Sequence, residues 1–262
     1  MTPATYVVPL DSSPFAESAV PVAVALAERD GGGVLLVSAS YRGPLEPRTY
    51  LDEVAARYPG ATIDTMPNVA PLPADAILKV VGEADDRVAC MTSHGRGGLR
   101  WSMLGSIAEE VVRRTDRPML LVGRHCRDDF LTRGTHVLAC VDAPESAGRI
   151  APVALEWAER LGLRTDVAVV VHPLDVDHVV HPDALVDPIV ETFGGAERVH
   201  AHLLTSSYAA GALVDLAGDL PAALMAMNCS GRTGLARVAL GSVTMAVLHL
   251  AACPVLVAHD PL

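Results

Sequence analysis

Residues 92–106 (TSHGRGGLRWSMLGS) combine glycine, serine and arginine in an arrangement that suits an anionic ligand. The first glycines of this stretch are Gly95, Gly97 and Gly98. Glycine tolerates positive φ and lets backbone N–H groups come close to a ligand. At the far end, Ser106 precedes the run IAEEVVRR, and we expect Ser106 to cap a helix with Glu109 completing a capping box. A helix N-terminus has unpaired N–H groups and the positive end of the dipole, so the stretch predicts a phosphate-binding loop.

The standard nucleotide and nucleophile motifs are absent from this stretch. No Lys follows a glycine at the spacing of GxxxxGK[ST], and the glycines do not form GxGxxG. A nucleophile elbow, GxSxG, is excluded because the residue two before Ser93 is Met91. An ordinary glycine-rich turn between a strand and a helix is the alternative interpretation.

The same stretch occurs twice in the chain. With a shift of 136 positions, residues 230–258 align with residues 94–122. The identical pairs include Gly95/Gly231, Arg96/Arg232, Gly98/Gly234, Leu104/Leu240, Gly105/Gly241, Ser106/Ser242 and Pro118/Pro254. The chain therefore contains an internal duplication of a unit of about half its length.

Composition agrees with two α/β domains. The chain has 262 residues, of which 50% are hydrophobic and only 4% aromatic. This usage suits parallel strands covered by helices on both faces, and the length suits two domains with a core each. The net charge of −11 disfavours nucleic acid and anionic membrane surfaces as partners.

Cysteines and apolar runs indicate a cytoplasmic protein. The five cysteines are scattered without a CxxC pair, so we expect small core residues in a reducing compartment. The N-terminal thirteen residues lack the basic and apolar regions of a signal peptide. The longest apolar tract, residues 243–258, is interrupted by His249 and Pro254, so no membrane span is predicted.

Strands alternate with helices in both copies. The strands expected in the first copy are residues 6–10, 34–39, 61–66, 87–91 and 119–122, and those in the second are 136–141, 167–172, 200–204, 222–227 and 255–258. Such alternation predicts βαβ units in a doubly wound parallel sheet. Each copy ends in proline and an apolar strand, and we expect the two halves to pair through these last strands as a pseudo-dimer.

The polar segment 126–135 is the predicted linker between domain 1, residues 1–125, and domain 2, residues 136–262. Asp11 and Asp142 each follow the first strand of a copy. Ligands of doubly wound sheets bind at the carboxyl ends of strands where the winding direction reverses. We therefore expect Asp11 and Thr92 to face the same site.

Three features together resemble the universal stress protein superfamily, here as a tandem two-domain member. They are an Asp closing the first strand, the pattern Gly-x2-Gly-x9-Gly-Ser before the last helix, and a final strand like Pro-Val-Leu-Val. The resemblance covers residues 5–125 and 136–260. It implies a five-stranded parallel α/β domain, like that of the adenine-nucleotide alpha hydrolases, which binds ATP with or without Mg²⁺.

The resemblance also implies which residues contact the nucleotide. In the first copy, Pro9, Leu10 and Asp11 contact adenosine, Ala39 flanks the base, Met91 and Thr92 lie near the ribose, and His94, Gly95, Gly105, Ser106 and Ile107 hold the phosphates. In the second copy, the corresponding residues are Val141, Asp142, Met227, Asn228, Ser230, Gly231, Gly241, Ser242 and Val243.

The sequence departs from the family pattern at several of these positions. Where the motif has its first glycine, this chain has Thr92 in one copy and Asn228 in the other. Either side chain restricts how closely a ligand can approach the backbone at that position. Ser230 replaces His94, and Met245 replaces Glu109, which removes the second capping box. The first site is therefore the better candidate.

Simpler interpretations exist for individual residues. Asp11 and Asp142 suit plain turn or cap residues. Arg96, Arg100 and Arg232 suit solvated surface charges as well as phosphate contacts. The segment 172–183 (HPLDVDHVVHPD) is rich in His and Asp, but its spacing fits no standard ligand pattern and it is expected to be a loop. We predict no metal site.

Three function classes follow. The leading hypothesis is an ATP-binding stress-response regulatory protein without a dedicated catalytic site, because the motif loops supply no paired catalytic carboxylates and no nucleophile with its base; slow ATP hydrolysis stays open. The second is an interaction module with empty sites. The third is an enzyme such as an ATP pyrophosphatase, which would show a serine-rich loop after the first strand, where this chain has only the two serines Ser12 and Ser13. Expected partners are an adenine nucleotide, a protein of unknown identity and a second copy of the chain.

Overall fold

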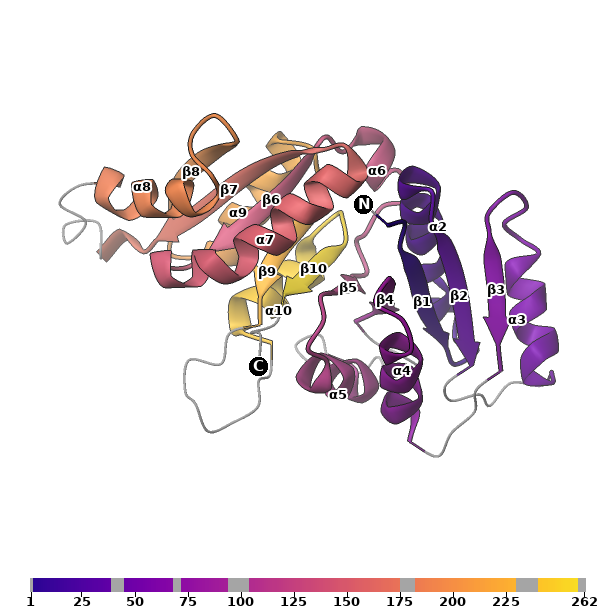
Figure 1. The fold of residues 1–262 in the computed structure, drawn as a ribbon. Coiled ribbons are helices and arrows are strands. Elements are labelled where there is room, and N and C mark those ends of the chain that lie inside the picture. The colour runs from indigo at the N-terminus through magenta and orange to yellow at the C-terminus, as the bar shows by residue number, and fades with distance from the viewer. Residues whose placement is uncertain are drawn as a thin grey trace. The chain divides into compact units, whose positions relative to one another are not determined.

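The computed structural model describes residues 2–38, 45–67, 72–93, 104–174, 182–229 and 240–258. The chain divides into two compact units (Figure 1). The first unit contains the described residues up to Val122, and the second contains those from Gly123 onward.

The first unit is built on a five-stranded parallel sheet. Its strands are β1 (Thr5–Leu10), β2 (Gly33–Ser38), β3 (Ile63–Met66), β4 (Arg87–Thr92) and β5 (Met119–Val122). Their order in the sheet is β3-β2-β1-β4-β5, and every adjacent pair is parallel. The predicted doubly wound parallel sheet is confirmed, with the winding reversed between β1 and β4.

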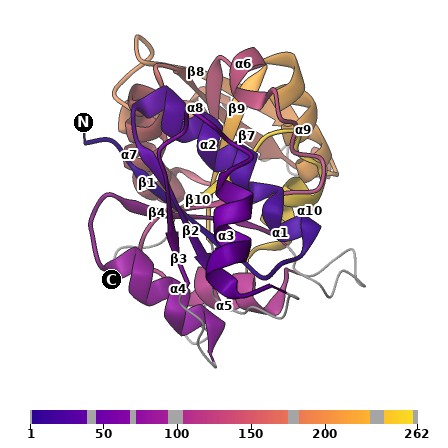
Figure 2. The ribbon, with the colours of Figure 1, turned by 90° about the vertical axis from the view of Figure 1, so that its right-hand side faces the viewer.

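Helices connect these strands and cover both faces of the sheet. They are α1 (Pro14–Glu17), α2 (Ala19–Asp30), α3 (Pro47–Ala55), α4 (Pro73–Gly82) and α5 (Ser106–Arg114). Right-handed crossovers put α2 and α3 on one face and α4 and α5 on the other, because the winding reverses between β1 and β4. Accordingly α4 packs against α5, and Figures 1 and 2 show α3 beside β3 at the edge of the sheet.

The second unit repeats the architecture of the first. Its strands are β6 (His136–Val141), β7 (Arg164–Val171), β8 (Val199–Thr205), β9 (Ala222–Asn228) and β10 (Val255–Ala258). Their order is β10-β9-β6-β7-β8, again with parallel pairs throughout. Its helices are α6 (Phe130–Arg133), α7 (Pro144–Leu161), α8 (Pro182–Thr192), α9 (Ala209–Asp219) and α10 (Ser242–Leu250). The duplication inferred from sequence thus extends to strand order.

Apolar runs form the strands because both faces of each sheet are covered. Every residue of β5 (MLLV) and of β10 (VLVA) is buried. Continuous burial of this kind is typical of parallel strands that lie between two helical layers. β5, β6 and β10 begin and end at the predicted residues.

The predicted helix cap at Ser106 is wrong. Gly105 is the N-cap of α5 and makes no side-chain cap bond, while Ser106 is the first helical residue. The reason is a backbone bond: Gly105 N donates to Ser93 O at 2.7 Å and fixes Gly105 in an extended conformation with φ −59° and ψ 141°. Gly241 is likewise the N-cap of α10 and makes no side-chain cap bond.

Two helices lie where the sequence suggested none. α6 lies within the predicted linker, and its Phe130 and Leu131 are buried. α8 begins at Pro182, inside the segment that we expected to be a loop.

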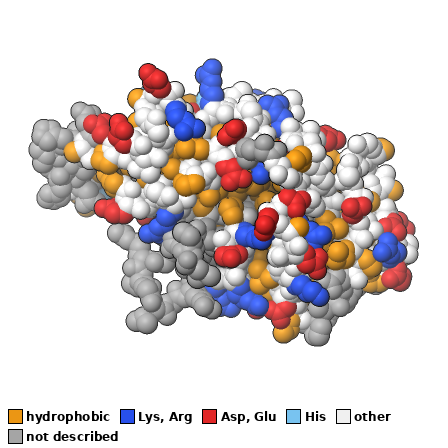
Figure 3. Space-filling view, viewed as in Figure 1, with side chains coloured by type: hydrophobic (Ala, Val, Ile, Leu, Met, Phe, Trp, Pro, Cys, Tyr) orange, Lys and Arg blue, Asp and Glu red, His pale blue; other side chains and the backbone are white. Residues whose placement is uncertain are grey.

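Charged side chains of both signs share the surface. On the face shown in Figure 3, acidic and basic side chains lie interspersed among apolar and uncharged ones. Exposed pairs such as Arg114 with Glu110 at 2.9 Å each contribute little to stability. No helix in the described ranges is long and apolar enough to cross a membrane.

Candidate functional site

The reversal of winding in the first unit brings two predicted site residues to neighbouring strand ends. β1 ends at Leu10, which Asp11 follows, and the adjacent β4 ends at Thr92. Open α/β sheets bind ligands outside the carboxyl ends of the strands at such a reversal. The strand order therefore places Asp11 and Thr92 at the position where this fold binds ligands.

Asp11 organises the turn after β1. Its Oδ1 accepts hydrogen bonds from Ser13 N at 3.0 Å and from Ser13 Oγ at 2.6 Å. Ser13 Oγ in turn accepts from Ala16 N at 3.1 Å, which makes Ser13 the N-cap of α1. Ser12, between them, has a φ of 64°. These bonds fix the direction in which Asp11 leaves the strand, as expected of a turn residue.

The N-terminus of α5 is held at the end of β4. Ser93 N donates to Val122 O at 3.0 Å, and Ser93 O accepts from Gly105 N at 2.7 Å. Glu109 N then donates to Gly105 O at 2.8 Å and closes the first helical turn. Ser106 is exposed and Ile107 is half-buried. The positive end of the α5 dipole thus lies beside the end of β4, where it favours an anion.

The second unit has the same framework. Its winding reverses between β6 and β9, so Val141 and Asp142 lie at one strand end and Met227 and Asn228 at the other. Cys229 N donates to Ala258 O at 2.9 Å, as Ser93 does to Val122 in the first unit. Asp142, Ser242 and Val243 are exposed, and Gly241 is half-buried.

One contact distinguishes the second unit from the first. Asn228 Nδ2 donates a hydrogen bond to the backbone carbonyl of Ser146 at 3.0 Å. Ser146 lies in the first turn of α7, which follows β6. The bond therefore joins the two sides of the switch point, which is the place between β6 and β9 where the winding of the sheet reverses.

Several predicted site residues lie outside the described residues. They are Ala39, His94, Gly95, Ser230 and Gly231, together with Arg96, Arg100 and Arg232. Asp175, Asp177, His178 and His181 of the His- and Asp-rich segment lie outside them too. Among the residues that are described, no group of three or more His, Cys, Asp or Glu is arranged to hold a metal ion.

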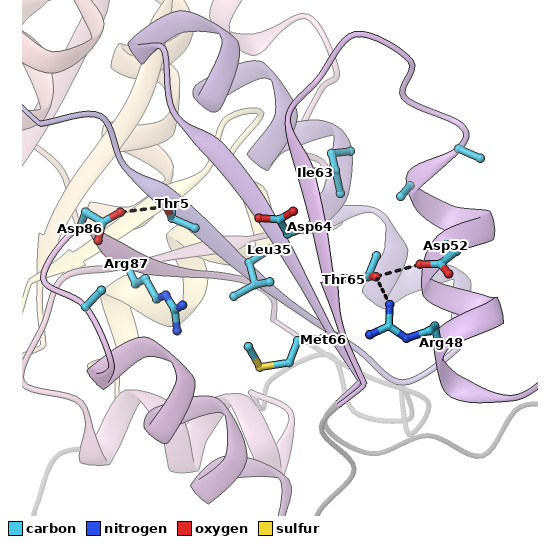
Figure 4. Close-up of a pocket in the computed structure, with 13 residues that line it drawn as sticks. Thr5, Leu35, Arg48, Asp52, Ile63, Asp64, Thr65, Met66, Asp86 and Arg87 are labelled. Carbon is cyan, nitrogen blue, oxygen red and sulfur yellow. Dashed lines mark hydrogen bonds between the residues drawn. The ribbon is translucent and has the colours of Figure 1, made fainter.

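A cavity of about 660 Å³ in the first unit lies away from the predicted site (Figure 4). It is lined by residues at the starts of β1 and β4 and by residues of β2, β3 and α3. Within it, Thr65 Oγ1 donates to Asp52 Oδ1 at 2.8 Å, and the Arg48 guanidinium donates to Thr65 Oγ1 at 3.4 Å. None of the predicted nucleotide contacts that the structure describes lines this cavity.

The corresponding cavity of the second unit, about 950 Å³, is lined by a histidine–aspartate cluster around the buried Asp166. Asp166 is only 5% exposed. Its Oδ1 lies 2.8 Å from His202 Nε2, and its Oδ2 lies 3.4 Å from His136 Nε2. The ring of His200 packs edge-on against His202, with 4.6 Å between the ring centroids.

The sequence analysis missed this cluster because its members come from three separate strands. By the strand registers, Thr5, Leu35 and Met66 are the first-unit residues equivalent to His136, Asp166 and His202. The alternation of His200 and His202 on β8 was the available signal, since alternate residues share a face of a strand.

The prediction of core cysteines is confirmed for four of the five and is wrong for Cys126. Cys90, Cys140, Cys229 and Cys253 are buried, Cys126 is half-buried, and none of these five described residues forms a disulfide. Burial raises the pKa of the Cys140 thiol to about 12. The pKa of Cys126 is raised to about 12 as well, by burial and secondarily by the charge of Asp128.

Two successive doubly wound parallel sheets with the same strand order define a tandem α/β protein. The chain belongs to the universal stress protein family, whose model matches residues 69–123 and 135–259.

Similar proteins agree with this assignment. Universal stress proteins of Mycobacterium tuberculosis and Mycobacterium bovis are each 30% identical over 202 residues, which is 72% of this chain. The match spans 66% of the length of these relatives.

Solved structures show the fold. A universal stress protein from Archaeoglobus fulgidus superposes with a TM-score of 0.65 at 18% identity over 98% of both chains. A Pseudomonas aeruginosa protein of unknown function has a TM-score of 0.64 at 15% identity, covering 98% of this chain and 92% of its own.

Proposed function

We propose that this chain is an adenine-nucleotide-binding regulatory protein of the stress response, that ATP is its ligand, and that it has no dedicated catalytic site. The observation that carries the proposal is that Asp11 follows β1 and that α5 begins beside the end of β4, the two neighbouring strands between which the winding of the first unit reverses. A carboxylate can accept hydrogen bonds from the ribose or base, and a helix N-terminus favours the phosphates, so the two groups together suit a nucleoside phosphate.

The phosphate donors are the first N–H groups of α5. The N–H of Gly105 is already used, because it donates to Ser93 O at 2.7 Å. Those of Ser106 and Ile107 belong to the first turn of α5, whose N–H groups have no intrahelical acceptor. Gly105 therefore contributes by its small size, and Ser106 and Ile107 contribute the hydrogen bonds. Each such anion–dipole interaction is worth about 0.3–1 kcal/mol, or up to about 2 where water is partly excluded.

The adenosine contacts come from the strand ends. A carboxylate has about four acceptor positions, so Asp11 can bond Ser13 through Oδ1 and still accept from adenosine. Leu10, Met91 and Thr92 are buried, with exposed fractions of 1%, 7% and 6%. We propose that these three residues form the surface on which the base and ribose pack. The remaining proposed contacts are Pro9, Ala39, His94 and Gly95 of the first unit. Their equivalents by position in the second unit are Val141, Asp142, Met227, Asn228, Ser230, Gly231, Gly241, Ser242 and Val243, and whether nucleotide occupies that second position is a separate question.

Further parts of the proposal concern the cellular setting. We place the chain in the cytoplasm, with Mg²⁺ as an optional companion of ATP. A protein partner and a second copy of the chain are the proposed binding partners, and nucleotide occupancy would select among them by stabilising one arrangement of the chain.

Equilibrium dialysis of the whole chain with ATP, ADP and AMP, with and without Mg²⁺, tests the proposal. We expect saturable ATP binding below millimolar concentration. Absence of binding at millimolar ATP under both conditions would favour an interaction module of the same fold. Phosphate release that an added acceptor substrate accelerates would favour an enzyme.

The variant Gly105→Val tests the placement of the phosphates. The φ of −59° at Gly105 suits any residue, so the helix start should be kept while the isopropyl group obstructs the phosphates. We expect binding to fall at least tenfold with an unchanged circular dichroism spectrum. Gly82→Val is the matched control, because Gly82 ends α4 and an added Cβ there meets no atom within 4 Å. Unchanged affinity in Gly105→Val would contradict the placement.

A further inference from the structure

The hydrogen bond from Asn228 to Ser146 crosses the switch point of the second unit. Asn228 is the last residue of β9, and Ser146 is in the first turn of α7. We infer that this bond closes the second switch point to nucleotide, so that the chain binds one nucleotide, in its first unit. The inference rests on the proposed function and adds which of the two sites is used.

The geometry leaves no space for a ligand between the bonded groups. The Nδ2 of Asn228 and the carbonyl oxygen of Ser146 are 3.0 Å apart, which is the ordinary length of such a bond. A ribose placed at this switch point would have to separate them. Asn228 is half-buried, so breaking the bond would take this acceptor from its Nδ2, whereas the carbonyl of Ser146 keeps its place in the hydrogen-bond ladder of α7.

The acceptor of the bond is itself held in place. Ser146 Oγ donates to Ala143 O at 2.8 Å, and Ala143 N donates to Ser146 Oγ at 3.4 Å. These two bonds join Ser146, in the first turn of α7, to Ala143, the residue just before the helix. α7 also packs against β6 and β9, the two strands that flank the switch point. Moving Ser146 away from Asn228 would therefore disturb the helix start as well as one side-chain bond.

The first unit is built differently at the same position. Thr92, the counterpart of Asn228, carries a hydroxyl on its Cβ in place of a carboxamide, so its donor lies one bond closer to the backbone than Asn228 Nδ2. The turn after β1 is held by bonds from Ser13 to Asp11, two residues earlier. The bonds of Asp11 to Ser13 thus stay within one turn of the first unit, whereas the bond of Asn228 crosses between the two sides of the second switch point.

The stoichiometry of ATP binding tests the inference. Isothermal titration of the whole chain with ATP should give one site per chain. Two sites per chain would overturn the inference and leave the proposed function standing. No binding would instead refute the proposed function, so the two failures are distinguishable.

A matched pair of variants locates the single site. Gly105 and Gly241 occupy the same position before α5 and α10, with φ of −59° and −58°. We expect Gly105→Val to abolish the single site and Gly241→Val to leave its affinity within about twofold. The opposite pattern, with binding lost in Gly241→Val, would overturn the assignment to the first unit.

Replacing Asn228 tests its assigned role. Asn228→Gly restores the glycine that the family motif has at this position and removes the donor. We expect the stoichiometry of ATP binding to rise from one to two, with the first site unchanged. A well-folded Asn228→Gly protein that still binds one ATP would overturn the role given to Asn228.

Discussion

At the scale of single residues, Asp11 has a structural and a proposed binding role that two substitutions separate. Asp11→Ala removes both hydrogen bonds to Ser13, and we expect it to lower the free energy of unfolding by about 1–2 kcal/mol. Asp11→Asn keeps an oxygen that can accept from Ser13 but loses the charge. We expect it to unfold within about 0.5 kcal/mol of wild type and to bind ATP more weakly.

Urea unfolding and ATP titration of both variants provide the measurement. Equal loss of stability in Asp11→Ala and Asp11→Asn would contradict the structural role, because only the first loses the acceptor. Unchanged ATP affinity in Asp11→Asn would contradict the binding role.

Cys126 offers a test of a raised pKa at a thiol that reagents can reach. Its pKa is raised from 9.0 to about 12 by burial and by Asp128, so the thiolate at pH 8 is much rarer than at an ordinary thiol. We expect alkylation of native Cys126 by iodoacetamide at pH 8 to be at least about tenfold slower than in the urea-unfolded chain, and to accelerate steadily up to pH 10. A rate that levels off near pH 9 would contradict the raised pKa.

The same shift has a consequence for stability. Because the folded pKa of Cys126 lies above the unfolded value, the folded chain holds this proton more tightly between pH 9.0 and about 12. The contribution of the thiol to stability is therefore complete below pH 9.0 and is lost as the pH rises through this range.

At the scale of elements, β6, β7 and β8 carry the histidine–aspartate cluster that the first unit lacks. His202→Met, which installs the first-unit residue, removes the 2.8 Å partner of a buried carboxylate. We expect it to lower the free energy of unfolding by about 1–3 kcal/mol. The triple exchange to the first-unit residues, His136→Thr, Asp166→Leu and His202→Met, removes the carboxylate too and should be less destabilising than the sum of the single changes.

Urea unfolding of the singles and the triple measures the coupling, which we expect to reach about 0.5–3 kcal/mol. Strict additivity would show that Asp166 and its two histidines do not act as a unit.

Thr135 Oγ1 lies 2.8 Å from His136 Nδ1. This arrangement suits a Thr135 hydroxyl that donates to Nδ1, while the protonated Nε2 of His136 faces Asp166.

The elements themselves were largely predictable from sequence, for a physical reason. Apolar runs such as MLLV of β5 are buried on both faces, so composition alone locates them. The start of α5 was not predictable in the same way, because Gly105 is fixed by a backbone bond to Ser93, twelve residues earlier. The cluster around Asp166 likewise depends on register between three strands, which no local pattern encodes.

At the scale of the whole molecule, duplication supplied two copies of one framework, and local changes made them different. Both units keep the strand order, the reversal of winding and a glycine before the last helix. Thr92 and Asn228 end the equivalent strands β4 and β9, and the Asn228 side chain is one atom longer than that of Thr92. The alignment identified this pair of positions, but the bond of Asn228 to Ser146 required the structure, since it joins residues 82 positions apart.

Nucleotide binding to one unit should stabilise that unit more than the other, because a ligand stabilises the state that binds it. A ligand at one hundred times its Kd stabilises the state that binds it by about 2.7 kcal/mol. We expect saturating ATP to slow amide hydrogen exchange in β1, β4 and α5 while β6, β9 and α10 change little. Equal protection of both units would contradict a single site in the first unit.

The central claim is that backbone amides at the start of α5 hold the phosphates of an adenine nucleotide. Amide chemical shifts of the whole chain, recorded by NMR during titration with ATP, test this claim most directly. We predict saturable shifts at Ser106 and Ile107, together with Asp11 at the end of β1. Saturable binding that leaves these amides unmoved, with shifts instead around the cavity lined by Thr5 and Arg87, would contradict it.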